Sequence, residues 1–243
     1  MKLESKVALV VGGSSGIGDA IARSFAAEGC RVVIIGRSED TLRKALEAPE
    51  YGDRGCHRVC DATDREAIEQ AIEWCEAEVG PLDFLVNSAG TNVSGRSFAD
   101  IDPDDFQKVL DANLNATFLA MRSVLKSMRA RGTGTIINVV SLGGLRSIPL
   151  AGVPYTASKF AQGSLGLIAN QEANEDGVRV TNIYPGETNT PIVDRRPTPP
   201  PPERRAAMLQ PDDVAAMALT VALLPPRAVV PEIVITPRHM PLN

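Results

Sequence analysis

The chain has 243 residues, of which 44% are hydrophobic and 23% charged, and its formal net charge is −5. This ordinary globular composition argues against a disordered chain or a coiled coil. The 25 basic and 30 acidic residues form no obviously basic stretch, so we expect no nucleic-acid partner. The first apolar run, residues 7–11, is too short for an export signal, and no run approaches the ~18 residues of a membrane span. We therefore expect a cytoplasmic protein with no membrane partner.

The four cysteines, at positions 30, 56, 60 and 75, are few for a chain of this size. Without an export signal, such a chain is expected to keep its thiols reduced. Cys56-His57-x-x-Cys60 offers three metal-ligand side chains, but zinc sites usually combine two such pairs and no second pair lies nearby. We expect no metal site.

Apolar runs that suit buried strands alternate with helical patterns along the whole chain. Strands are predicted at 7–11, 31–35, 57–60, 84–86, 135–140, 178–183 and 232–235. Helices are predicted at 19–28, 39–48 (ended by Pro49), 64–79, 103–131 in two pieces, 155–176 and 211–223. This rhythm indicates βαβ units. We predict a single-domain, doubly wound α/β fold of the Rossmann type over residues 1–243, with a mostly seven-stranded parallel sheet and helices on both faces.

The proline-rich stretch at about 191–210 interrupts this rhythm. A proline run is stiff and cannot join a sheet ladder. It could be a surface spacer, but it follows the C-terminal end of a strand, where open α/β sheets bind ligands. We therefore favour a flap over a cleft.

A glycine-rich turn joins the first strand to the first helix, with the spacing G-x-x-x-G-x-G at Gly12, Gly16 and Gly18. Glycine lets a ligand approach the backbone N–H groups, and the helix N-terminus attracts a pyrophosphate. Ser14 and Ser15 can add hydroxyl donors. The second strand ends at Arg37 rather than at a carboxylate. A guanidinium can pair with a 2′-phosphate, so we favour NADP(H) over NAD(H). The alternative is that Arg37 is a surface arginine without a ligand, and we consider it less favoured.

Tyr155 and Lys159 are four residues apart, so on a helix they share one face. A neighbouring ammonium favours the phenolate and lowers the pKa of a tyrosine toward the working range of an acid–base catalyst. Ser141 follows a buried strand and could hold a substrate oxygen. Asn113 lies in an apolar helical stretch, where its amide could join a water chain to Lys159 or be a satisfied structural group.

Together these residues resemble the short-chain dehydrogenase/reductase family, in its NADP-dependent branch, over nearly the whole chain. The matching pieces are Gly12-x-x-x-Gly16-Ile17-Gly18, Asp61, Asn87-Ser88-Ala89-Gly90, Asn113, Ser141, Tyr155-x-x-x-Lys159, and Pro185-Gly186 followed by Thr190. Three departures stand out. Val11 replaces the usual threonine, Ser88 replaces an asparagine, and the Ser141–Tyr155 spacing is one residue longer than usual.

The resemblance implies a role for each matching position. Tyr155 would be the general acid or base, Ser141 would orient the substrate oxygen, and Asn113 would hold a relay water. Lys159 would lower the Tyr155 pKa and bind the nicotinamide ribose. The other implied cofactor contacts are Gly12, Ser14, Ser15, Gly16, Ile17, Gly18, Arg37, Asp61, Ala62, Asn87, Ala89, Gly90, Pro185, Gly186, Thr188 and Thr190.

The resulting hypothesis is an oxidoreductase that transfers a hydride between NADP(H) and the carbonyl or secondary alcohol of a small molecule. The alternative is a catalytically silent NADP(H)-binding sensor or scaffold, which would have no need for the Tyr155–Lys159 pair. The epimerases and dehydratases among longer relatives usually carry G-x-x-G-x-x-G, which this chain lacks.

The resemblance also implies a homodimer or homotetramer through the helices at about 106–131 and 155–176. Small residues there, at Ala116, Ala120, Ala161, Gly163 and Gly166, are expected on the exposed side, with packing on the sheet as the alternative. The substrate is not readable from the sequence. Arg146, Arg195 and Arg196 could meet a substrate carboxylate or could be solvated surface groups.

Overall fold

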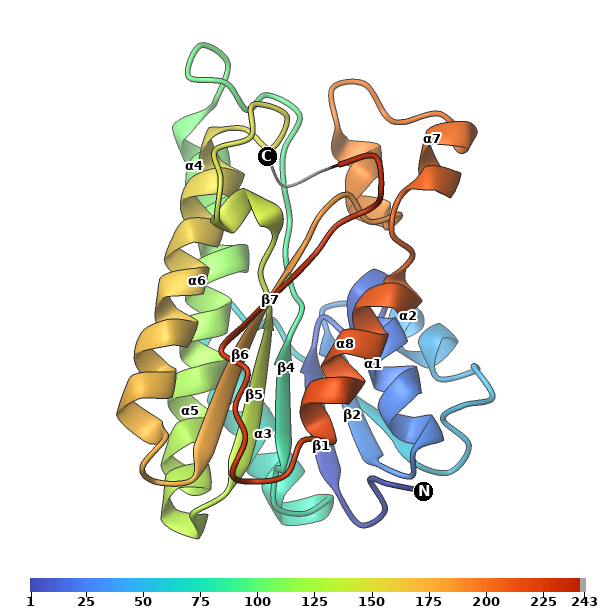
Figure 1. Ribbon diagram of the computed structural model, residues 1–243, viewed down its shortest axis with the longest axis vertical. Helices are drawn as coiled ribbons and strands as arrows, with labels where there is room; N and C mark the ends of the chain where they lie inside the picture. The colour runs from blue at the N-terminus through green and yellow to red at the C-terminus, as the bar shows by residue number, and fades with distance from the viewer. Residues whose placement is uncertain (241–243) are drawn as a thin grey trace.

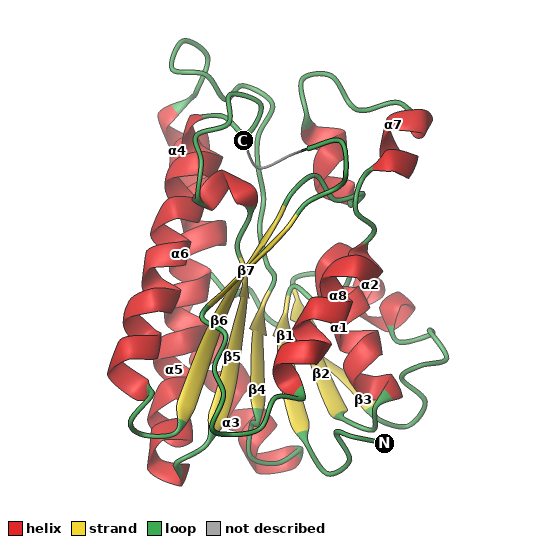
Figure 2. Cartoon of the chain, viewed as in Figure 1, coloured by secondary structure: helices red, strands yellow, loops and turns green. Residues whose placement is uncertain are grey.

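Seven strands pair into one parallel sheet in the computed structural model, which describes residues 1–240 (Figures 1 and 2). The strands are β1 (Val7–Val11), β2 (Arg31–Gly36), β3 (Gly55–Val59), β4 (Phe84–Asn87), β5 (Gly134–Val139), β6 (Val178–Pro185) and β7 (Glu232–Ile235). Their order is β3-β2-β1-β4-β5-β6-β7, and every pair is parallel. The predicted fold is confirmed; residues 241–243 of the predicted domain lie outside the described residues. Since the order reverses between β1 and β4, a ligand crevice is expected there.

The two faces of the sheet build two separate apolar cores, because alternate strand residues point to opposite faces. Ala8 and Val10 pack with α1 (Gly16–Ala27) and α8 (Pro211–Ala222). Leu9 and Val11 pack on the other side with α3 (Arg65–Glu78) and α5 (Ala116–Arg131). In Figure 1, α1, α2 (Glu39–Ala45) and α8 lie on one side of the view, and α4 (Pro103–Leu110), α5 and α6 (Val153–Ala173) on the other.

Local sequence signals explain several helix ends. Gly29, with φ of +95°, follows the last turn of α1, which is the left-handed position that glycine fills best. Asp64 caps α3 by accepting from the backbone N–H groups of Glu66 and Ala67. Pro49 does not end α2 as expected, because α2 already stops at Ala45 and the following residues form turns.

The long helical pattern at 103–131 is two helices, α4 and α5, as predicted. They are joined by one wide π-helical turn, Asp111–Asn115. Asn113 lies in this turn and is fully buried. Such turns interrupt the regular hydrogen-bond ladder and re-aim side chains.

The small residues on α5 and α6 mostly face inward, contrary to our expectation. Ala116 and Ala120 are buried. A Cβ at Gly163 would lie 2.9 Å from the Tyr184 hydroxyl, and one at Gly166 would lie 2.0 Å from Asn182 Oδ1. These glycines therefore let α6 pack closely on β6, and the outer face of α5 and α6 carries larger apolar side chains instead.

The proline-rich segment at 191–210 also differs from a plain extended flap. It contains a 3-10 turn, Pro191–Arg195, and a short helix, α7 (Pro202–Ala207). Figure 1 shows α7 beyond the C-terminal ends of the strands. No helix within residues 1–240 is long and apolar enough to cross a membrane.

Candidate active site

A cleft of about 770 Å³ runs along the C-terminal ends of the strands. Its walls combine the turn after β1, the ends of β2 and β4, the loop before α6 and the segment after β6. Most of the predicted site residues line it, namely Gly12, Ser14, Ser15, Gly16, Ile17, Arg37, Asp61, Ala62, Ala89, Gly90, Ser141, Tyr155, Lys159, Pro185, Gly186, Thr188 and Thr190. Gly18, Asn87 and Asn113 do not line it.

The glycine-rich turn is shaped by close backbone contacts. Gly12 has a φ of +80°, and a Cβ on it would lie 2.7 Å from the Cα of Ala89. A Cβ on Gly18 would lie 2.2 Å from the Gly12 carbonyl oxygen, so Gly18 serves helix–turn packing rather than the cleft wall. Ser15 precedes α1 without capping it through its side chain. This helix end leaves N–H donors and two serine hydroxyls at the cleft, which suits a pyrophosphate.

Arg37 lies at the adenosine end expected for a dinucleotide in this cleft. Its side chain is exposed and forms no ion pair with any residue of the described range 1–240. The nearest downstream carboxylate, Glu39, is bonded to Arg43 instead, at 2.6 Å. Asp61, on the neighbouring wall, accepts from the backbone N–H and hydroxyl of Thr63. The arginine is therefore free to meet an anion at this end.

Ser141, Tyr155 and Lys159 meet at the other end of the cleft. The Ser141 Oγ accepts from the Gly143 N–H at 3.1 Å and is hydrogen-bonded to Tyr155. The Lys159 Nζ lies 5.7 Å from the centre of the Tyr155 ring. It donates to the Val139 carbonyl oxygen at 3.0 Å and to the Gln162 Oε1 at 2.7 Å. The longer Ser141–Tyr155 loop thus keeps the two hydroxyls in contact.

Burial and nearby polar groups shift the pKa values in this cluster. Burial raises the pKa of Tyr155, while the hydrogen bond with Ser141 and the charge of Arg196 act to lower it. Burial lowers the pKa of Lys159 itself to about 7. The ammonium form of Lys159 therefore titrates near neutral pH.

Asn113 is a fully bonded structural group in this structure. Its Oδ1 accepts from the Thr91 N–H at 2.7 Å, and its Nδ2 donates to the Thr91 carbonyl and to the Ser158 hydroxyl. A protein-only chain nevertheless links its backbone to Lys159. The Gln162 Nε2 donates to the Thr117 Oγ1, which donates to the Asn113 carbonyl.

Asn87 begins a ladder of buried amides rather than lining the cleft. Its Nδ2 donates to Asn138 Oδ1 at 2.9 Å, and Asn138 Nδ2 donates to Asn182 Oδ1 at 3.0 Å. These three asparagines are partners in register on β4, β5 and β6. The ladder ties the ends of the strands together beneath the cleft.

Comparison with known proteins agrees with this geometry. Residues 6–200 match the family model described as short chain dehydrogenase. The chain belongs to the short-chain dehydrogenase family. It is 37% identical over 221 residues to a 3-alpha-(or 20-beta)-hydroxysteroid dehydrogenase of Mycobacterium tuberculosis, covering 91% of this chain and 84% of that protein. It is 34% identical to a 3beta-hydroxysteroid dehydrogenase of Mediterraneibacter gnavus, covering 80% and 70%.

Solved structures show the same architecture. A metagenomic short-chain oxidoreductase in complex with NADP superposes with a TM-score of 0.84 at 30% identity, covering 98% of this chain and 99% of that one. This short-chain dehydrogenase is accordingly an oxidoreductase of the class that acts on CH–OH and C=O groups.

The sequence analysis missed two polar residues of the site. Gln162 lies three residues after Lys159 on α6 and is fully buried. The sequence signal that could have identified Gln162 is the presence of a polar residue on the face of the helix that is buried. Arg96, in the loop after β4, lines the cleft of this dehydrogenase and is 8% exposed. Nothing in the local pattern distinguishes Arg96 from a surface arginine.

Proposed function

We propose that this enzyme reduces a carbonyl group, or oxidises the matching secondary alcohol, of a small molecule with NADP(H). The observation that carries the proposal is the meeting of Ser141, Tyr155 and Lys159 at one end of the cleft. The glycine-rich turn supports a dinucleotide along the rest of the cleft.

Bound NADP(H) would supply the hydride chemistry. In the reducing direction, Ser141 holds the substrate oxygen by a hydrogen bond, and Tyr155 transfers its hydroxyl proton to that oxygen. In the oxidising direction the phenolate of Tyr155 takes the proton back. Lys159 lies 5.7 Å from the centre of the Tyr155 ring; in its charged form it would favour the phenolate and would hold the nicotinamide ribose. Asn113 supports Thr91 on the cleft wall and is linked to Lys159 through Gln162 and Thr117.

The preference for NADP(H) rests on Arg37. A guanidinium at the end of β2 that has no ion-pair partner among residues 1–240 suits the 2′-phosphate better than it suits a free 2′-hydroxyl. The solved relative that carries NADP supports a nicotinamide cofactor in this cleft.

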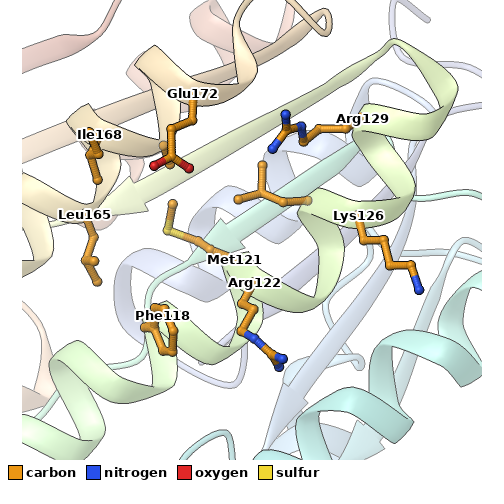
Figure 3. Close-up of a pocket in the computed structure, with 10 residues that line it drawn as sticks. Phe118, Met121, Arg122, Lys126, Arg129, Leu165, Ile168 and Glu172 are labelled. Carbon is orange, nitrogen blue, oxygen red and sulfur yellow. The ribbon is translucent and has the colours of Figure 1, made fainter.

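We also propose a homodimer or homotetramer built on the outer face of α5 and α6. This face holds a groove of about 590 Å³, lined by apolar residues that include Phe118, Met121, Leu165 and Ile168. Figure 3 shows Phe118 and Met121 on one helix and Leu165 and Ile168 on the other, with Arg129 and Glu172 at one end. Phe118 and Ile168 are each 47% exposed. Large exposed apolar patches commonly mark interfaces.

The four cysteines are free thiols. Reduced thiols are typical of the cytoplasm, so they support our proposal of a cytoplasmic enzyme.

The proposed chemistry is tested by Tyr155→Phe, which removes the proton donor but keeps the ring. Turnover of carbonyl substrates should fall by roughly 10²–10⁴-fold, while NADPH binding, followed by its fluorescence, should stay close to that of the unmodified enzyme. Unchanged turnover would refute the role of Tyr155. Tight NADPH binding without turnover of any carbonyl or alcohol by the unmodified protein would instead support the silent-sensor alternative.

A further inference from the structure

Arg96 is a buried cation at the substrate end of the cleft, with no counter-ion among residues 1–240. Its Nη1 donates to the Leu150 carbonyl at 3.2 Å and its Nη2 to the Arg195 carbonyl at 2.5 Å. Its Nε has no hydrogen-bond partner within the part of the chain that the structure describes. Among residues 1–240 no carboxylate forms an ion pair with it. Buried charges are normally paired, so this guanidinium requires an explanation.

Two carboxylates of the segment that follows β6, Glu187 and Asp194, are engaged by other groups. Glu187 bonds Arg196 at 3.0 Å, Arg204 at 2.6 Å and His239 at 3.0 Å. Asp194 is bonded to Arg205.

A second cation lies beside Arg96. The carbonyl of Arg195 accepts from Arg96, and the Arg195 guanidinium donates to the Thr91 hydroxyl. Arg195, like Arg96, has no ion-pair partner in the part of the chain that the structure describes. Both residues line the cleft, as do Thr91 and Tyr155. The charge of Arg196 lowers the pKa of both Arg96 and Tyr155, so Arg196 lies near both side chains.

Arg96 is held by the two segments that enclose the substrate end. Its backbone oxygen accepts from Val153, the first residue of α6, at 2.8 Å. Its stem packs on Gly152, where a Cβ would lie 2.6 Å from the Arg96 Cβ. The guanidinium then bridges the loop before α6 and the 3-10 turn after β6. A group fixed this firmly is pre-organised for a ligand.

We propose that the substrate carries a carboxylate, bound by Arg96 and Arg195, in addition to its carbonyl or alcohol group. A planar guanidinium matches a carboxylate with paired N–H donors. The proposed binding sites for the cofactor phosphates are the glycine-rich turn and Arg37, at the ends of β1 and β2. They are separate from the loops that hold Arg96 and Arg195. This inference rests on the proposed function and specifies the substrate class of the same cleft.

The first test compares 3-oxobutanoate with its methyl ester in NADPH oxidation. The unmodified enzyme should have a higher kcat/KM for the acid. In Arg96→Met, which keeps the apolar stem, the ratio of acid to ester kcat/KM should fall about 10- to 100-fold, the value of a hydrogen bond to a charged group. Arg96→Lys should restore part of the ratio. Arg227→Met, at an exposed arginine outside the cleft, is the matched control and should leave the ratio unchanged.

The second test measures binding without turnover. Butanoate and butanamide, titrated calorimetrically into the NADP⁺-saturated enzyme, differ only in charge and terminal group. Butanoate should bind more tightly, and Arg96→Met or Arg195→Met should remove the difference while thermal melting confirms folding.

The outcomes separate the two proposals. Equal kcat/KM for acid and ester, together with an equal effect of Arg96→Met on both, overturns the carboxylate site and leaves the oxidoreductase intact. Selective butanoate binding that is lost in Arg96→Met supports the anion site even where neither oxo compound is turned over, and the proposed chemistry is then tested by Tyr155→Phe with other carbonyl substrates. Equal binding of butanoate and butanamide overturns the anion site.

Discussion

Lys159 donates to the side-chain oxygen of Gln162 across 2.7 Å, and both residues are fully or almost fully buried on α6. Burial lowers the pKa of Lys159 to about 7, because a low-dielectric environment disfavours the ammonium. An acceptor at this distance stabilises the ammonium. We therefore expect Gln162 to act as a positioning residue that helps to keep Lys159 charged near neutral pH.

This relationship predicts opposite pH shifts for two variants. If reduction needs the ammonium, activity falls as the pH rises through the Lys159 pKa. Gln162→Leu removes the acceptor, lowers that pKa further, and should move the alkaline limb of kcat/KM about one pH unit lower. Gln162→Glu adds a negative charge and should move the limb higher. A purely structural role would reduce activity without moving the limb in opposite directions. Gln171→Leu, on the exposed side of the same helix, is the control.

Arg37 should decide between the two nicotinamide cofactors. Arg37→Asp removes the proposed 2′-phosphate contact and adds an acceptor for a ribose hydroxyl. The ratio of kcat/KM for NADPH to that for NADH should fall by about 10- to 100-fold or more. Lys44→Asp makes the same charge change on the exposed part of α2 and should leave the ratio unaltered. A native enzyme that already prefers NADH would show that the role assigned to Arg37 is wrong.

The strands and the glycine-rich turn were predictable because their physical requirements are local. Five consecutive buried residues in β1 need apolar side chains on both faces, and Gly12 needs a φ of +80° and space beside Ala89. The orientation of α5 and α6 was not predictable in this way. Each helix carries a stripe of small residues and a stripe of large apolar ones, and only the tertiary packing decides which stripe faces the sheet.

The hydrogen-bond partners of the site residues could not be predicted from the sequence either. Asn87 fits a cofactor contact by motif, but its pairing with Asn138 depends on the register of two strands that are far apart in the chain. The charge state of Tyr155 depends on burial and on Ser141 and Arg196, which reach it only in the folded chain. Tertiary neighbours, not spacing along the helix, set these properties.

The apolar groove on α5 and α6 should control assembly. Phe118→Glu combined with Ile168→Glu places two charges on the proposed interface, where each large apolar side chain contributes roughly 1.5–3 kcal/mol on burial. The mass measured by light scattering should fall to that of a monomer. Phe98→Glu alters a side chain that is 90% exposed and does not line the groove, and it should not change the mass. A native protein that is monomeric at all concentrations would contradict the interface.

Glu187 fastens the segment at 191–210 over the cleft. Its carboxylate bonds Arg196 and Arg204 from that segment and His239 near the C-terminus. Backbone bonds between Glu187, Asn189 and Leu209 close the base of the same segment. Burial alone would raise the pKa of Glu187, but the bonds from His239, Arg204 and Arg196 outweigh burial and lower it. The carboxylate therefore stays charged, and the segment stays fastened, down to pH values below the ordinary range of a glutamate.

Glu187→Gln should release this segment at neutral pH. Loss of one partner from a buried ion pair costs up to about 3–5 kcal/mol, and less here because the Arg204 side chain is 45% exposed. Trypsin should then cleave faster at Arg204 and Arg205, and KM for the carbonyl substrate should rise more than kcat falls, since the segment walls the substrate end. Glu203→Gln, on the exposed side of α7, should change neither the rate of tryptic cleavage nor the KM for the carbonyl substrate. If Glu187→Gln is cleaved no faster than Glu203→Gln, the carboxylate does not hold the segment in place.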